Sequence, residues 1–167
     1  MTLKLDRPAL SREEFMALQG LEDGEGRGYE YEDGRLIPVP PVYGPQSSAW
    51  GDLFSSVQQH VRRRLGRIWL DLAVYLDPEE RKRYFPDIVY LAKDRLHQFD
   101  GRVVVGPPTL VVEVTDEDSQ ERDRKTKMRA YHEAGVPWYW IADVVIRQIE
   151  EYRWTAAGCE LVAQTPF

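Results

Sequence analysis

Short apolar segments along the chain predict the strands of a central sheet. Residues 109–115 are almost continuously β-branched, which is typical of a strand covered on both faces. Residues 68–76, 85–92 and 138–142 are further apolar runs of strand length. These segments are separated by polar, glycine-rich or helical stretches, so the pattern predicts a sheet inside a mixed α/β domain.

Two longer segments have apolar residues at the spacing of an amphipathic helix. Residues 46–65 form the first, and Gly66 follows as a C-cap. Its apolar positions are Trp50, Leu53, Phe54, Val57, Val61 and Leu65. The second helix is expected over about residues 119–134, and the capping-box spacing of residues 11–14 predicts a short helix near the N-terminus.

Turn residues mark two hairpins. Asp33 and Gly34 separate residues 29–32 from residues 35–39, and a final hairpin is expected from residues 148–154 and 159–163. The whole pattern predicts an α/β fold with a central mixed β-sheet flanked by helices and an N-terminal β-hairpin. We expect residues 1–167 to form one domain, with a core over about residues 28–155.

Composition limits the cellular setting. No apolar run approaches the ~20 residues of a membrane span, and the first residues lack the apolar stretch of a signal peptide. We therefore expect a cytoplasmic protein with no membrane partner. Cys159 is the single cysteine, which excludes an intramolecular disulfide and a multi-cysteine metal site.

The net charge of −6 argues against a broadly basic surface that coats DNA. It does not exclude a nuclease, because acids that bind metal make the metal-free chain look more acidic. Three consecutive arginines, Arg62, Arg63 and Arg64, crowd the end of the first long helix. They are candidate contacts to nucleic-acid phosphates, although a solvated helix end would explain them more simply.

Glu113 lies in the middle of the buried strand over residues 109–115. A buried carboxylate without a partner costs several kcal/mol, so a metal ion or a basic residue must lie beside it. Asp87 opens the apolar run over residues 85–92, 26 positions earlier, and the two strands can pair. Both side chains could then point at one ion, and Mg²⁺ prefers one or two carboxylates with water and substrate phosphate.

The helix after Glu113 carries candidate positive charge. Lys127 and Tyr131 are four residues apart and share one face, so Lys127 can reach the metal if the helix packs beside the strand. Lys125 is the main competitor for this role, and a solvated helix face is the simpler alternative for both. Asp123 most simply pairs with Lys127 or Arg124.

Five segments carry a more specific resemblance. They are the hairpin residues 29–36, Phe85-Pro-Asp-Ile-Val89, Gly106-Pro-Pro-Thr-Leu-Val-Val-Glu-Val114, the helical pattern of Asp123, Lys127 and Tyr131, and Gly135-Val-Pro-Trp-Tyr-Trp-Ile-Ala-Asp143. Together they resemble the Uma-type family of restriction endonucleases, in the PD-(D/E)XK nuclease superfamily. The resemblance covers roughly residues 30–154. It implies the restriction-endonuclease-like fold.

The resemblance also implies roles for individual residues. Asp87 and Glu113 would bind Mg²⁺ or Mn²⁺, with the backbone carbonyl of Val114 as a further ligand. Glu30 would bind the metal or orient Lys127. The superfamily usually places its lysine two residues after the glutamate, where this chain has Thr115, so the family pattern implies that Lys127 polarises the attacking water. Tyr131 and Asp123 are candidates for supporting contacts.

The implied activity is magnesium-dependent hydrolysis of DNA phosphodiesters. A homodimer is expected as well, because such nucleases commonly cut duplexes as pairs and residues 138–140 are Trp-Tyr-Trp. Two alternatives fit the same residues. One is a protein that binds nucleic acid without cutting it, which a Lys127 side chain pointing away from the carboxylates would favour. The other is a structural or protein-interaction module, which the acidic charge favours mildly.

Overall fold

A computed structural model of the protein describes residues 11, 14, 28–39, 44–61, 65–77 and 82–167. The strands are β1 (Tyr29–Glu32), β2 (Arg35–Pro38), β3 (Gly66–Leu70), β4 (Val74–Tyr75), β5 (Lys82–Tyr84), β6 (Ile88–Ala92), β7 (Val104–Val105), β8 (Leu110–Thr115), β9 (Trp138–Asp143), β10 (Gln148–Thr155) and β11 (Gly158–Pro166). The helices are α2 (Gly44–Val61), the 3-10 helix η1 (Lys93–Gln98), the π-helix η2 (Arg122–Lys127) and α3 (Met128–Glu133).

A six-stranded mixed sheet forms the centre of the fold, in the order β11-β10-β9-β8-β6-β3. β8 pairs parallel with β9 and antiparallel with β6. Every residue of β8 is buried, as its β-branched sequence predicts. The central mixed sheet that the sequence predicts is therefore confirmed.

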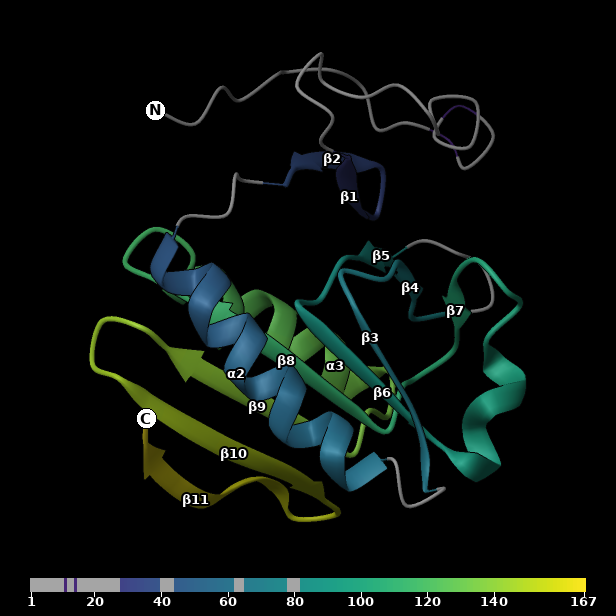
Figure 1. The fold of residues 1–167 in the computed structure, drawn as a ribbon. Helices are drawn as coiled ribbons and strands as arrows, with labels where there is room; N and C mark the ends of the chain where they lie inside the picture. The colour runs from purple at the N-terminus through teal and green to yellow at the C-terminus, as the bar shows by residue number, and fades with distance from the viewer. Residues whose placement is uncertain (1–10, 12–13, 15–27, 40–43, 62–64, 78–81) are drawn as a thin grey trace.

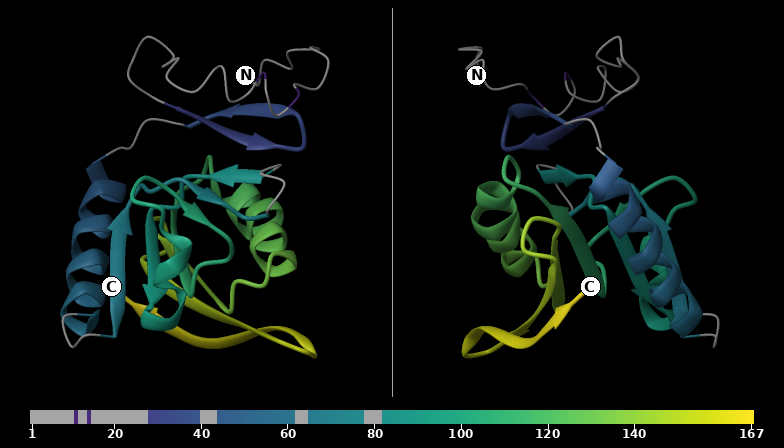
Figure 2. Two further views of the ribbon diagram at one scale, coloured as in Figure 1. Left: turned by 90° about the vertical axis from the view of Figure 1, so that its right-hand side faces the viewer. Right: turned by 60° about the vertical axis from the view of Figure 1, so that its left-hand side comes forward.

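The two faces of this sheet are covered by different helices, as Figures 1 and 2 show. Side chains alternate along β8, so Val112 and Val114 pack with α2 in one cluster. Val111 belongs to a second cluster, on the side of α3, which includes Tyr131. Glu113 is in phase with Val111, so its carboxylate is directed toward the side of η2 and α3.

A second, five-stranded sheet has the order β2-β1-β5-β4-β7 and was not predicted. The predicted N-terminal hairpin is confirmed as its β1–β2 edge, with Glu32 opposite Arg35. Asp33 and Gly34 form its turn, with φ angles of 44° and 90°. Positive φ at both positions suits a two-residue hairpin turn. Through β5, this sheet brings the hairpin toward the helix that follows β8 (Figure 1).

The single strand predicted over residues 68–76 is wrong. The chain breaks at Asp71, whose φ is 47°, and β3 and β4 belong to different sheets. Aspartate tolerates this left-handed conformation better than most residues. Its N–H donates to the carbonyl of Asp87 at 3.2 Å, which holds the break beside the start of β6. The sequence did not reveal the break because the apolar run continues on both sides of Asp71.

Some predictions lie wholly or partly outside the described residues. Arg62, Arg63 and Arg64 are not described, nor is most of the short N-terminal helix. Ser11 and Glu14 are described and make both hydrogen bonds of a capping box, at 2.8 and 3.2 Å. Within the described part of the chain, no helix has the length and apolar character needed to cross a membrane.

Candidate active site

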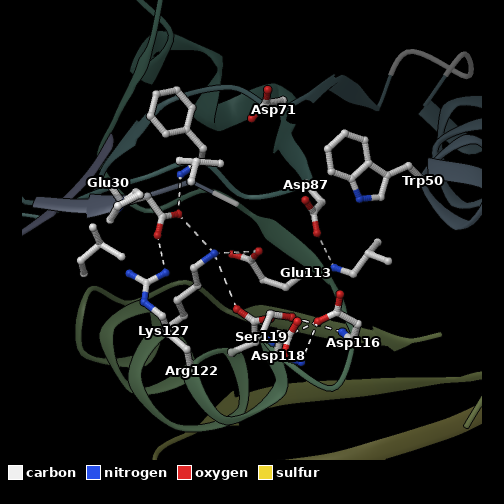
Figure 3. Close-up of a pocket in the computed structure, with 16 residues that line it drawn as sticks. Glu30, Trp50, Asp71, Asp87, Glu113, Asp116, Asp118, Ser119, Arg122 and Lys127 are labelled. Atoms are coloured by element: carbon white, nitrogen blue, oxygen red, sulfur yellow. Dashed lines mark hydrogen bonds and ion pairs between the residues drawn. The ribbon is translucent and has the colours of Figure 1, made fainter. Parts of the chain in front are cut away.

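A pocket of about 330 Å³ opens where β6 begins and β8 ends. Figure 3 shows carboxylates and basic groups converging in it. Its lining residues are Glu30, Ile37, Pro38, Val39, Trp50, Asp71, Phe85, Asp87, Glu113, Val114, Asp116, Asp118, Ser119, Arg122, Asp123 and Lys127. All four side chains that the sequence predicted as catalytic are among them.

Asp87 and Glu113 lie side by side at the end of the β6–β8 pair. Ile88 is opposite Val112, so Asp87 and Glu113 follow one position beyond that pair. Residues at opposite positions of an antiparallel pair project on the same face. The N–H of Val114 donates to Asp87 Oδ2 at 2.5 Å, which ties one carboxylate to the strand that carries the other.

Lys127 enters the pocket from η2 and contacts three carboxylates. Its Nζ lies 3.0 Å from Glu113 Oε2, 3.2 Å from Glu30 Oε1 and 3.6 Å from Asp123 Oδ1. The Lys127 side chain is only 9% exposed, whereas that of Lys125 is 73% exposed and pairs with Glu121 on the surface. The structure therefore brings Lys127, and not its competitor Lys125, to the carboxylates.

Glu30 reaches the pocket from β1 in the second sheet. One of its oxygens accepts the Phe85 N–H at 3.1 Å, and Arg122 pairs with the other. Arg122 also pairs with Glu32 at 2.6 Å. Glu30 is 3.2 Å from Lys127 Nζ, a contact that suits orientation of this lysine.

The π-helical turn explains how Arg122 and Lys127 both reach Glu30. Residues five apart do not share a face in an α-helix, but the i→i+5 hydrogen bonds of a π-helix bring them into line. η2 spans Arg122–Lys127, and its two end residues contact the same carboxylate. Arg122 was missed by the sequence analysis because α-helical periodicity places it away from Lys127.

Two tyrosines hold Glu113 and the backbone of Asp123 in place. The Tyr131 hydroxyl donates to Glu113 Oε1 at 3.1 Å, so both oxygens of Glu113 have a partner. Tyr139 donates to the backbone carbonyl of Asp123 at 3.0 Å. Tyr131 and Tyr139 are both fully buried. The arrangement fixes the position of the Glu113 side chain and of the first turn of η2.

Burial is the main influence on the pKa values of Asp87 and Glu113. Burial raises the pKa of Asp87 to about 7, although Lys127 opposes that rise. Burial also raises the pKa of Glu113 well above its usual value, against the attraction of Lys127 and with the repulsion of Asp123 and Asp87. Burial alone would lower the pKa of Lys127, but Glu113, Glu30 and Asp123 outweigh it, so Lys127 stays protonated.

The carboxylates of the pocket suit a hard divalent cation that keeps some of its water ligands when bound. Among the described residues, no group of three or more His, Cys, Asp or Glu side chains is arranged as a complete metal site. Asp87 and Glu113 supply two carboxylates, which is what Mg²⁺ takes when water and substrate phosphate complete its coordination. Burial raises the pKa of both groups, and a bound cation would favour their ionised forms.

Sequence reasoning missed Trp50 and Asp71 as well as Arg122. Trp50 fits the apolar face of α2, and its periodicity gave no sign that its side chain also lines the pocket. Asp71 enters the pocket because the chain breaks there, and the predicted continuous strand concealed that break. Asp143, which the sequence placed at the end of its strand, pairs with Arg124 at 3.0 Å.

Comparisons with known proteins identify the fold and the family of the chain. The chain is similar to a crystal structure of a "putative nuclease belonging to DUF820" from Anabaena variabilis, with a TM-score of 0.72 and 21% identity over 91% of this chain and 83% of that chain. This likeness shows the restriction-endonuclease-like fold. No match was found among curated proteins. The model of the Uma2 family, described as "Putative restriction endonuclease", matches residues 12–166, so the chain belongs to the Uma2 family.

Proposed function

We propose that the protein is a metal-dependent endonuclease that hydrolyses DNA phosphodiester bonds in this pocket. The observation that carries the proposal is the contact of Lys127 Nζ with Glu113, at 3.0 Å, beside Asp87. Its family points to nuclease activity, and restriction-endonuclease-like proteins generally use divalent metal ions. A surface lysine pointing away from the acids would have favoured a protein that binds nucleic acid without cutting it.

Asp87, Glu113 and the carbonyl of Val114 would hold the ion, Mg²⁺ or Mn²⁺. When bound, this ion supplies a Lewis acid for the phosphoryl oxygen and activates the attacking water. Asp87 is held by the Val114 N–H and Glu113 by the Tyr131 hydroxyl, so neither carboxylate needs to reorganise on binding.

We assign Lys127 the role of a positive charge and not of a general base, because the neighbouring carboxylates raise its pKa well above the usual value. It would orient the attacking water and offset the negative charge that develops on the phosphoryl oxygens. Glu30 and Asp123 hold its ammonium group in place. Arg122 completes this support by fixing Glu30.

Metal binding is expected to release protons below about pH 7. The Asp87 carboxyl has a pKa of about 7 in the metal-free protein, so a cation must displace its proton at lower pH. Because the unfolded chain ionises this group at lower pH, the metal-free protein loses stability as the pH rises toward about 7, and bound metal offsets that loss.

Calorimetric titration with Mn²⁺ in two buffers of different ionisation enthalpy measures the released protons. We expect about one proton or more per ion near pH 6 and fewer near pH 8.5. A proton count near zero at the lower pH would contradict the assignment of Asp87 as a ligand.

We also propose that the protein works as a homodimer, but through a different surface from the predicted Trp-Tyr-Trp segment. Tyr139 is fully buried, and its tryptophan neighbours pack in the cluster beneath α2. Leu161 and Val162 on the edge strand β11 are 45% and 47% exposed. An exposed apolar edge strand is a ready template for pairing with a second copy.

Val162→Lys is expected to convert the dimer to monomer, because a charge on that edge opposes strand pairing. Light scattering after gel filtration measures the mass of both proteins. A monomeric wild-type protein, or a variant that remains dimeric, would count against this interface.

Cleavage assays on supercoiled plasmid and on single-stranded DNA test the proposed activity. Each substrate is incubated with Mg²⁺, with Mn²⁺ or with a chelator. Cutting that needs the metal is the expected result. Mn²⁺ binding without any cutting would instead favour the non-catalytic binder, and salt-insensitive failure to bind DNA would favour an interaction module.

A further inference from the structure

Trp50 lines the pocket and has a buried polar atom, the indole nitrogen. It lies in α2, and its ring packs on the cluster between α2 and the sheet while also lining the pocket. Its Nε1 is buried and has no hydrogen-bond partner among the described residues. Leaving a buried donor unsatisfied is costly, so a partner is expected in the working state.

The candidate acceptor is the Asp87 carboxylate, with which the Trp50 side chain interacts. Figure 3 shows the indole nitrogen on the side of the ring that faces Asp87, while the Val114 N–H approaches this carboxylate from the strand β8. The two donors approach from different elements, α2 and β8.

An unpaired indole nitrogen does not by itself indicate a role in the pocket. Trp140 and Trp154 also have a buried Nε1 without a partner in the described part of the chain. Neither of them lines the pocket. Trp50 differs because its N–H is directed at a carboxylate that we assign to the metal.

We propose that Trp50 is a positioning residue for Asp87, whose carboxylate accepts the indole N–H when a divalent cation is bound. The inference rests on the proposed function, since it takes Asp87 as a metal ligand. With the Val114 N–H on Oδ2, a second donor fixes the rotation of the carboxylate and directs its remaining lone pairs toward the cation. Because Trp50 lies in α2, the same hydrogen bond would couple the position of this helix to cation binding.

The test compares Trp50→Phe with Trp140→Phe. Both variants lose one buried indole N–H and keep an aromatic ring in the same cluster, but only the first alters the pocket. Calorimetry with Mn²⁺ is expected to show about tenfold weaker binding, or more, for Trp50→Phe. Wild-type affinity is expected for Trp140→Phe.

Nuclear magnetic resonance of the wild-type protein gives a readout that does not depend on either variant folding. Five tryptophans give five indole N–H resonances, and the spectrum of Trp50→Phe identifies the one from Trp50. Should that variant not fold, selective broadening by Mn²⁺ identifies the same resonance by its proximity to the site. Addition of Mg²⁺ is expected to move this proton downfield, as a new hydrogen bond does.

Different results overturn different claims. If Asp87→Asn loses Mn²⁺ binding but Trp50→Phe binds as wild type, the positioning role of Trp50 is wrong and the metal site stands. An unmoved Trp50 resonance at saturating Mg²⁺ also overturns this role. If the wild-type protein binds no Mn²⁺, both the inference and the proposed function are overturned.

Discussion

Glu113→Gln is expected to reduce DNA cleavage by about 10³-fold or more, while the protein remains folded. The amide keeps the size of the side chain and can still accept the Tyr131 hydroxyl, but it removes the charge that binds the cation and pairs with Lys127. Nicking of supercoiled plasmid in Mg²⁺ measures the rate. Thermal unfolding measures whether the fold is retained.

Glu160→Gln is the matched control for this change. Glu160 is about half exposed and pairs with Arg153 on the C-terminal hairpin, far from the pocket in sequence and in the sheet order. Its cleavage rate should equal that of the wild-type protein. Cleavage that survives in Glu113→Gln at the wild-type rate would place the chemistry elsewhere or attribute it to a contaminant.

Lys127→Met is expected to lower both activity and stability. Removing the ammonium leaves Glu113, Glu30 and Asp123 buried without their shared cation, and breaking such a buried pair typically costs about 3–5 kcal/mol. Cleavage should fall by about 10²-fold or more, as when one transition-state donor is lost. Chemical denaturation measures the loss of stability and plasmid nicking measures the activity.

The control for this variant is Lys125→Met. Lys125 lies two residues away, but its ion pair with Glu121 is exposed at both ends and contributes little. The Lys125→Met protein should unfold and cleave DNA like the wild-type protein. A large effect in Lys125→Met with none in Lys127→Met would reverse the assignment of the two lysines.

We also expect Mg²⁺ to raise the unfolding temperature of Lys127→Met more than that of the wild-type protein, because the ion replaces part of the lost charge.

The position of the lysine distinguishes this chain from the usual superfamily arrangement. Thr115 stands two residues after Glu113, where that lysine is expected, and it is fully buried with its hydroxyl 2.9 Å from Ser119. Lys127 reaches the same carboxylate from η2 instead. β8 therefore provides the carboxylate of this ion pair, and the positive charge comes from the helix that follows.

The sheet and its two acids could be predicted from sequence because their signals are local. The β-branched run of β8 and the apolar run of β6 identify two buried strands, and the loop between them allows these strands to pair, as they do. That pairing alone places Asp87 beside Glu113. The four-residue spacing of Lys127 and Tyr131 predicted that the two side chains share one helix face, and in the structure both contact Glu113.

The parts that could not be predicted depend on long-range pairing or on irregular backbone. The second sheet is built from strands of two to four residues, too short to carry a periodic signal. The left-handed Asp71 and the π-turn that aligns Arg122 with Lys127 both depart from regular geometry. Each of these irregular features brings a side chain into the pocket, as functional sites often do.

Anomalous diffraction from crystals of the wild-type protein soaked in Mn²⁺ tests most directly whether the two acids form a metal site. We predict a Mn²⁺ peak between the carboxylates of Asp87 and Glu113, with the Lys127 ammonium beside it, and no such peak in crystals of Glu113→Gln. An empty pocket at saturating Mn²⁺, or an ion bound only at other residues, would contradict the account.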